Sequence, residues 1–150
     1  VLQRLEKSRI LKSKIEGKNK YFSLNLDNIE TKYLLVQAET YKTLSFLQKY
    51  QTFKSFFKEI QIKNPALIFG SFAAFSADKK SDVDMLIICD KKEELPTHLL
   101  PHQIHVIILK EKEFISALEK GETLIKKIQE HHIIMNNHSF FVEAMWRKYA

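Results

Sequence analysis

The chain has 150 residues, of which 45% are hydrophobic and 28% charged, proportions typical of one soluble globular domain with a core. Its net charge of +6 favours anionic partners such as nucleic acids, although a lysine-rich solvated surface explains the same charge. No apolar run reaches the roughly 20 residues of a membrane span, and no signal-peptide pattern is present, so we expect a cytoplasmic protein with no membrane partner. The single cysteine, Cys89, excludes an internal disulfide and is expected to be a buried, inert thiol.

Residues 1–28 combine a helical pattern with a basic hairpin. Apolar residues have helical spacing over residues 1–12, and a turn at residues 17–19 separates two short strand-like segments, 14–16 and 21–26. Because the chain begins with Val1 inside the helical pattern, we expect it to be a piece of a longer protein.

A helix followed by such a hairpin resembles the end of a winged helix-turn-helix domain. The resemblance makes residues 12–25 the wing, and it implies that Lys14, Lys18 and Lys20 contact DNA phosphates. The alternative is a hairpin that merely covers the core of the main domain, residues 29–150.

From residue 29 to residue 60 the apolar pattern is helical, and a break at residues 50–52 indicates two helices. Phe53, Phe56 and Phe57 share one face of the second helix. An aromatic stripe of this kind is typical of a core or of a homodimer interface, and a surface that stacks nucleobases is the alternative.

Two apolar strands follow, and acidic residues begin the second one. Residues 66–69 predict a buried strand, after which we expect a Gly70-Ser71 turn, a short helix and a polar loop. Asp82 and Asp84 then lead into an apolar strand, and because side chains alternate along a strand, both carboxylates point to the same face. Adjacent carboxylates repel each other unless a cation lies between them, and Mg²⁺ prefers oxygen ligands. We therefore expect these two residues to bind Mg²⁺ or Mn²⁺.

The remainder of the chain alternates between helix and strand patterns. Residues 90–103 predict a loop, residues 104–109 a third strand, and residues 111–120 and 122–130 two helices, the first closed by Gly121. Residues 131–138 predict a short apolar segment with a turn. His131 and His132 are expected at the end of the preceding helix, and Ser139 is the expected N-cap of a final helix. The pattern predicts an α/β (α+β) domain, in which helices flank a small mixed sheet.

The segment from Gly70-Ser71 to Asp82-x-Asp84 resembles the DNA polymerase β-type nucleotidyltransferase superfamily. The resemblance implies that Gly70 and Ser71 bind a nucleoside triphosphate. Glycine permits close approach of a phosphate to the backbone, and the start of a helix favours an anion. Lys79 or Lys80 would add positive charge to the phosphate site.

The sequence departs from this family at three positions. Ala74 and Phe75 stand where active members often have a basic residue and a glycine, and His105 stands where they have a third carboxylate on the next strand. An imidazole accepts protons near neutral pH but is a poor ligand for Mg²⁺.

Two functions are consistent with these residues. The first is a transferase that moves a nucleoside monophosphate from a nucleoside triphosphate to a hydroxyl group of a protein, a small molecule or a nucleic acid. In this function Asp82, Asp84 and His105 are the catalytic residues. The second is a catalytically inactive module of the same fold that acts as a DNA-binding regulator or an antitoxin-like partner.

Overall fold

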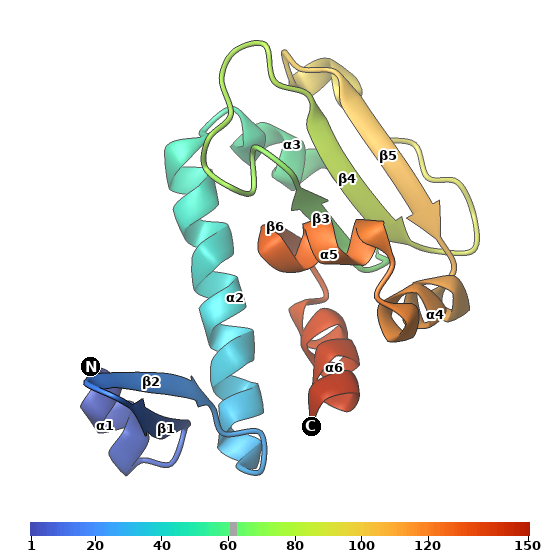
Figure 1. Ribbon diagram of the computed structural model, residues 1–150. Helices are drawn as coiled ribbons and strands as arrows, with labels where there is room; N and C mark the ends of the chain where they lie inside the picture. The colour runs from blue at the N-terminus through green and yellow to red at the C-terminus, as the bar shows by residue number, and fades with distance from the viewer. Residues whose placement is uncertain (61–62) are drawn as a thin grey trace.

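A four-stranded mixed sheet lies at the centre of the computed structural model, which describes residues 1–60 and 63–150 (Figure 1). The sheet has the order β5-β4-β3-β6, and its strands are β3 (Ala66–Phe69), β4 (Val83–Ile88), β5 (Ile104–Leu109) and β6 (His132–Asn136). β3 pairs antiparallel with β4 and β6, whereas β4 pairs parallel with β5. The predicted mixed α/β class is confirmed.

Helices cover both faces of this sheet because its inner strands are apolar on both sides. One face packs against α2 (Ile29–Lys49) and α3 (Phe53–Glu59), and the other packs against α4 (Glu111–Lys120), α5 (Thr123–Glu130) and α6 (His138–Tyr149). Phe53 and Phe56 of α3 are fully buried, which confirms that the aromatic stripe is part of the core. A short 3₁₀ helix, η1 (Thr97–Leu99), lies in the predicted loop before β5.

The predicted hairpin is present and lies at the N-terminal end of α2, away from the four-stranded sheet (Figure 1). It consists of β1 (Leu11–Glu16) and β2 (Asn19–Leu24), joined by a tight turn in which Gly17 has a φ of +61°. The preceding helix, α1 (Leu2–Lys7), is shorter than predicted, and Glu6 of α1 binds Lys20 of β2 at 2.7 Å. Neither of the two core clusters contains a described residue of the hairpin.

The prediction of a short helix after Gly70 is wrong, because this segment forms a series of turns. The backbone N–H of Ala74 donates to the Gly70 carbonyl and that of Ser76 to the Ser71 carbonyl, both at 3.0 Å. Phe75 has a φ of +59°, and this left-handed conformation prevents the turns from continuing as a helix.

The region before the last helix also differs from the prediction. Residues 132–136 form the strand β6, in which Ile133 and Ile134 are buried on opposite faces of the sheet. α6 begins at His138, and its N-cap is Asn137 with a φ of +53°, so the prediction of Ser139 as N-cap is wrong.

Cys89 is buried at the end of β4, as expected. Its thiol donates to the Lys91 carbonyl at 2.8 Å, and burial raises the pKa of this thiol, which makes it unreactive. Within residues 1–60 and 63–150, no helix has the length and apolar character that a membrane span requires.

Candidate nucleotide and metal site

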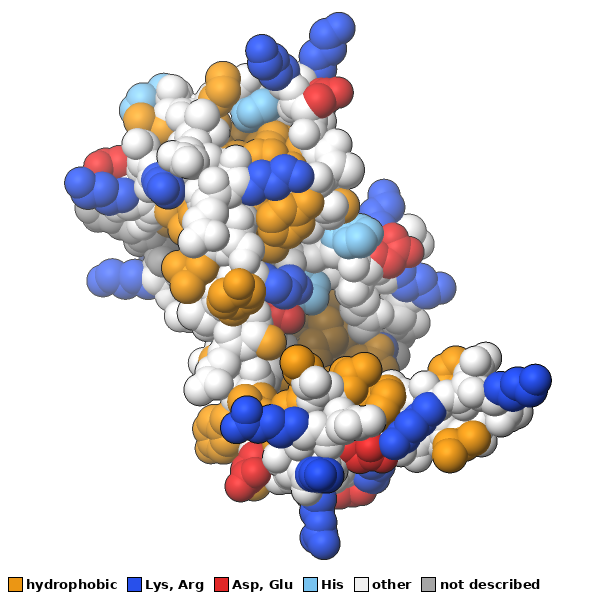
Figure 2. Space-filling model, turned by 90° about the vertical axis from the view of Figure 1, so that its left-hand side faces the viewer, with side chains coloured by type: hydrophobic (Ala, Val, Ile, Leu, Met, Phe, Trp, Pro, Cys, Tyr) orange, Lys and Arg blue, Asp and Glu red, His pale blue; other side chains and the backbone are white. Residues whose placement is uncertain are grey.

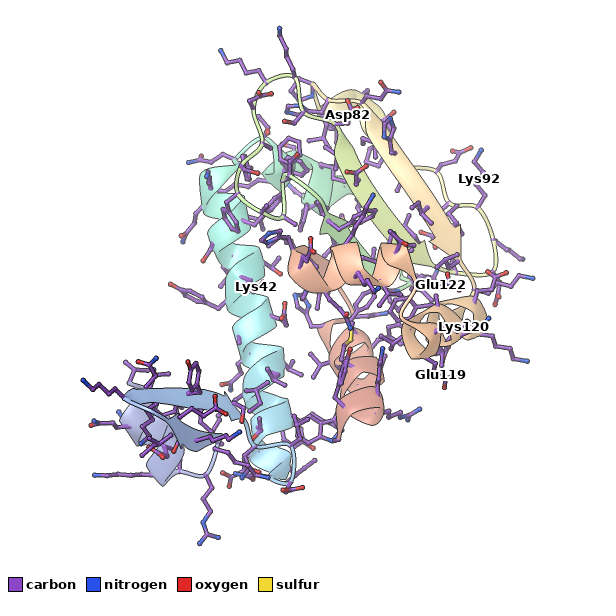
Figure 3. The ribbon with its side chains drawn as sticks, viewed as in Figure 1. Lys42, Asp82, Lys92, Glu119, Lys120 and Glu122 are labelled. Carbon is purple, nitrogen blue, oxygen red and sulfur yellow. The ribbon has the colours of Figure 1, made fainter. Side chains whose placement is uncertain are left out.

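The two aspartates lie at one end of β4. Asp82 immediately precedes the strand, and Figure 3 shows it at the end of the sheet that is far from α4. Asp84 lies within β4, where its neighbours across the sheet are Phe69 of β3 and His105 of β5. The parallel register of β4 and β5 therefore places an imidazole next to the acidic pair.

The His105 ring lies beside both carboxylates. Its Nε2 is 3.8 Å from Asp82 Oδ2, and its Nδ1 is 3.7 Å from Asp84 Oδ1. These separations are too long for hydrogen bonds but short enough for charge attraction when the ring is protonated. All three side chains are between 39% and 51% exposed, so water and a solute can reach them.

Gly70 lies directly against Asp84. A Cβ atom at position 70 would lie 2.6 Å from Asp84 Oδ2, closer than non-bonded atoms approach. The φ of Gly70 is +73°, a conformation that other residues rarely adopt. Both the space and the backbone conformation at this position therefore require glycine.

A cleft of about 510 Å³ opens beside this pair, a volume suited to a small ligand. The sheet contributes Phe69, Gly70, Asp84 and Ile107 to its lining, and α5 with its C-cap contributes Leu124, Lys127, Glu130 and His131. None of the α5 residues was expected from the sequence to be part of the site. Helical spacing places Leu124, Lys127 and His131 on one face of α5, but that spacing does not say which strand the face meets.

The other predicted site residues lie outside the lining of this cleft. Ser71 follows Gly70 in the series of turns, and Lys79 and Lys80 lie in the exposed turn before β4. Two bonds to Ser81, the residue before Asp82, hold this turn: the Ser81 hydroxyl donates to Asp78 Oδ1 at 3.2 Å, and His102 Nδ1 lies 2.9 Å from the Ser81 carbonyl.

A second hollow, of about 460 Å³, lies between α2 and α6 and is almost entirely apolar. Glu39 and His132, two of its lining side chains, already contact each other, since Glu39 Oε2 lies 3.1 Å from His132 Nε2. His131 and His132, adjacent in the sequence, therefore line different cavities. The cleft beside Asp84 is the better candidate for a phosphorylated ligand, because glycine, lysine and carboxylate groups meet there.

The acidic pair fits a hard divalent cation. Among the described residues, no group of three or more His, Cys, Asp or Glu side chains is arranged to hold a metal ion. Mg²⁺, however, is commonly bound by one or two carboxylates together with water and substrate phosphates. Asp84, which lines the cleft, and the exposed Asp82 just before β4 match that donor set.

Residues 51–139 match the family model described as "Polymerase beta, Nucleotidyltransferase". The matched segment extends from just before α3 to the start of α6, and it includes Gly70, both aspartates, His105 and α5. Comparisons with curated proteins and with solved structures give no match.

Proposed function

The chain belongs to the polymerase β nucleotidyltransferase family, and from this membership we propose that it transfers a nucleoside monophosphate from a nucleoside triphosphate to a hydroxyl group. The proposed acceptor hydroxyl belongs to a protein, a small molecule or a nucleic acid, and the reaction takes place in the cytoplasm. The observation that supports this proposal is the placement of Asp84 directly against Gly70 at the cleft, with Asp82 and Asp84 each beside a ring nitrogen of His105.

Each residue has a distinct role in the proposed reaction. Asp82 and Asp84 would hold Mg²⁺ or Mn²⁺, which neutralises negative charge on the phosphates when bound. Gly70 lets the triphosphate approach the backbone closely, and Lys127 supplies positive charge from the opposite wall of the cleft. Ser71, Lys79 and Lys80 are further candidates for phosphate contacts at the rim.

His105 takes the proton in this proposal. The acceptor oxygen bonds to the α-phosphorus, the bond to pyrophosphate breaks, and the hydroxyl proton passes to the imidazole. The ring nitrogens lie 3.8 Å from Asp82 and 3.7 Å from Asp84, which places the imidazole next to the proposed metal ligands.

The experiment is calorimetric titration of each nucleoside triphosphate in the presence of Mn²⁺, followed by assay of pyrophosphate release with protein and RNA acceptors. We expect Asp84→Asn to weaken nucleotide binding about tenfold or more, because it removes a charged ligand. Asp90→Asn is the matched control, because Asp90 is an exposed aspartate beyond the other end of β4. Failure of the unaltered protein to bind any nucleotide would contradict the proposal.

A second candidate function is a catalytically inactive member that senses nucleotides or binds DNA. The observation that favours it is the pairing of Asp84 with His105, where active members carry a third carboxylate. Nucleotide binding without turnover, restored to turnover by His105→Asp, would support this candidate. For the DNA-binding version, Lys14, Lys18 and Lys20 are the proposed phosphate contacts, and binding should weaken steeply as salt increases.

A further inference from the structure

The outward face of α2 combines exposed hydrophobic side chains with polar ones. Its large hydrophobic side chains are widely exposed: Tyr33 is 65%, Leu34 38%, Tyr41 71% and Leu44 55% accessible. The opposite face of the helix packs into the domain through Thr31, Thr43 and Phe46. Figure 2 shows the side of the molecule on which α2 lies, and hydrophobic side chains recur along it.

The residues of this face follow the spacing of a helix–helix interface. Leu34, Gln37, Tyr41, Leu44 and Gln48 are separated alternately by three and four positions, which is the spacing of a coiled-coil seam. Ala38 and Ser45 lie beside the seam. None of these seven residues belongs to either core cluster of the described chain. We call these seven residues the α2 stripe.

The absence of charge on the α2 stripe favours a second copy of the same chain as its partner. The protein has a net charge of +6, so two copies repel each other over most of their surfaces. The α2 stripe contains no Lys, Arg, Asp or Glu, and contact between two such stripes therefore places no like charges together. We propose that the α2 stripe is the interface of a homodimer.

The size and charge of the side chains favour antiparallel helices. A two-fold axis between positions 38 and 41 places Ala38 against the partner's Tyr41 and Leu34 against the partner's Ser45, so that Tyr41 and Leu34 each meet a small side chain. The same axis brings Glu30 near the partner's Lys49, whose Nζ already donates to the Phe75 carbonyl at 2.7 Å and retains two further N–H donors. Parallel helices would instead place Tyr41 against Tyr41 and Glu30 against Glu30.

The area of the stripe predicts a reversible dimer. A fully buried aromatic side chain covers about 150–250 Å², so Tyr41 and the other six residues of the stripe together bury on the order of 500 Å² per copy. The total, about 1,000 Å², lies at the lower limit for a specific protein interface.

Sedimentation velocity of the full chain, from low to several hundred micromolar, tests the proposal. We expect a concentration-dependent dimer, and Tyr41→Glu should weaken dimerisation about tenfold or more, because it buries a charge in the seam. Tyr21→Glu is the matched control, since Tyr21 is an exposed tyrosine on β2 outside the α2 stripe. Equal circular dichroism spectra establish that both variants fold. A monomer at all concentrations, or a Tyr41→Glu variant that dimerises normally, would overturn the proposal.

Oxidative cross-linking tests the orientation. Ala38→Cys should form a disulfide-linked dimer, because position 38 lies next to its own copy across the axis. Gln48→Cys should not, because the two copies of position 48 are about 25 Å apart along antiparallel helices. Cross-linking of Gln48→Cys as readily as Ala38→Cys would overturn the antiparallel arrangement. Native Cys89 is buried and does not compete.

Discussion

The Asp84 carboxylate occupies space that a side chain at position 70 would need. This contact joins the turn after β3 to the acidic strand β4, so the conformation of one depends on the other. Gly121 offers a useful comparison, because its φ of +64° is similar, yet no atom lies within 4 Å of a Cβ added there.

Gly70→Ala and Gly121→Ala should therefore differ in one respect. Both impose a left-handed conformation on alanine, and each should lower the free energy of unfolding by about 1–2 kcal/mol. Only Gly70→Ala also displaces the Asp84 carboxylate, and it alone should weaken Mn²⁺ binding. Urea unfolding and Mn²⁺ titration provide the two measurements, and equal Mn²⁺ affinity of the two variants would contradict this account.

His138 makes stability depend on pH. Burial lowers the pKa of this imidazole, against an opposing effect of Glu39, and its Nε2 lies 2.9 Å from Thr43 Oγ1. Because the folded protein binds a proton at His138 less readily than the unfolded chain, stability should fall as the pH decreases below 6.5.

Thermal unfolding across this pH range measures the effect. His138→Gln, which cannot titrate, should reduce the slope of unfolding temperature against pH. His98→Gln, at an exposed position in η1, should leave the slope unchanged. The same slope in both variants would show that another group is responsible.

At the level of elements, a hydrogen bond from Thr43 connects α2 to the sheet. Its hydroxyl donates to the Ile134 carbonyl of β6 at 2.7 Å, in a buried environment. Thr40, one turn earlier on α2, makes only a local bond to the Val36 carbonyl at 2.9 Å on the exposed side.

Thr43→Val should destabilise the protein more than Thr40→Val does. The first change removes the buried hydroxyl that bonds to the Ile134 carbonyl and to His138 Nε2, which costs about 1–3 kcal/mol, whereas the second changes an exposed helix position. Valine keeps the branched shape in both cases, and urea unfolding gives both free energies. Equal losses would mean that the bond to β6 adds no stability.

Elements with strong local signals were predicted well from the sequence. The helix Glu111–Lys120 has acidic residues in its first turn and ends at Gly121 in the left-handed conformation, and its predicted bounds are correct. β6 was missed because it is short and contains polar residues, and its extended conformation depends on pairing with β3. The turns after Gly70 were missed because nothing in the sequence indicates that Phe75, an ordinary aromatic residue, adopts a positive φ.

The candidate site was predictable only where neighbouring strands form it. Asp82, Asp84 and His105 meet because β4 and β5 pair in register, and the resemblance to the nucleotidyltransferase superfamily had placed His105 at the position of the third carboxylate. Lys127 and His131 reach the cleft because α5 passes over the sheet next to Gly70. That placement results from tertiary packing, and no local pattern in the sequence specifies it.

At the scale of the whole molecule, β5 is an edge strand with little protection. Val106, Ile107 and Ile108 are each more than a third exposed, and β5 contains no charged residue apart from the titratable His105. An exposed apolar edge pairs readily with other strands, because its N–H and C=O groups are unmatched on one side.

Ile108→Lys should therefore reduce aggregation, measured by light scattering during heating. Ile108 is suitable because it does not line the cleft beside Asp84. Ile15→Lys changes a widely exposed isoleucine in the separate hairpin and should have less effect. If both variants scatter equally, the edge of the main sheet is not the site of association.

The length of α2 has a consequence for any nucleic acid that the protein contacts. α2 has 21 residues and is about 31 Å long at 1.5 Å per residue, with the hairpin at its N-terminal end. In an antiparallel pair of these helices, the two hairpins are separated by about the length of α2. If the protein forms the proposed antiparallel dimer and its hairpins bind DNA, this separation, close to the roughly 34 Å of one helical turn of B-DNA, would match two inverted half-sites on one face of the duplex.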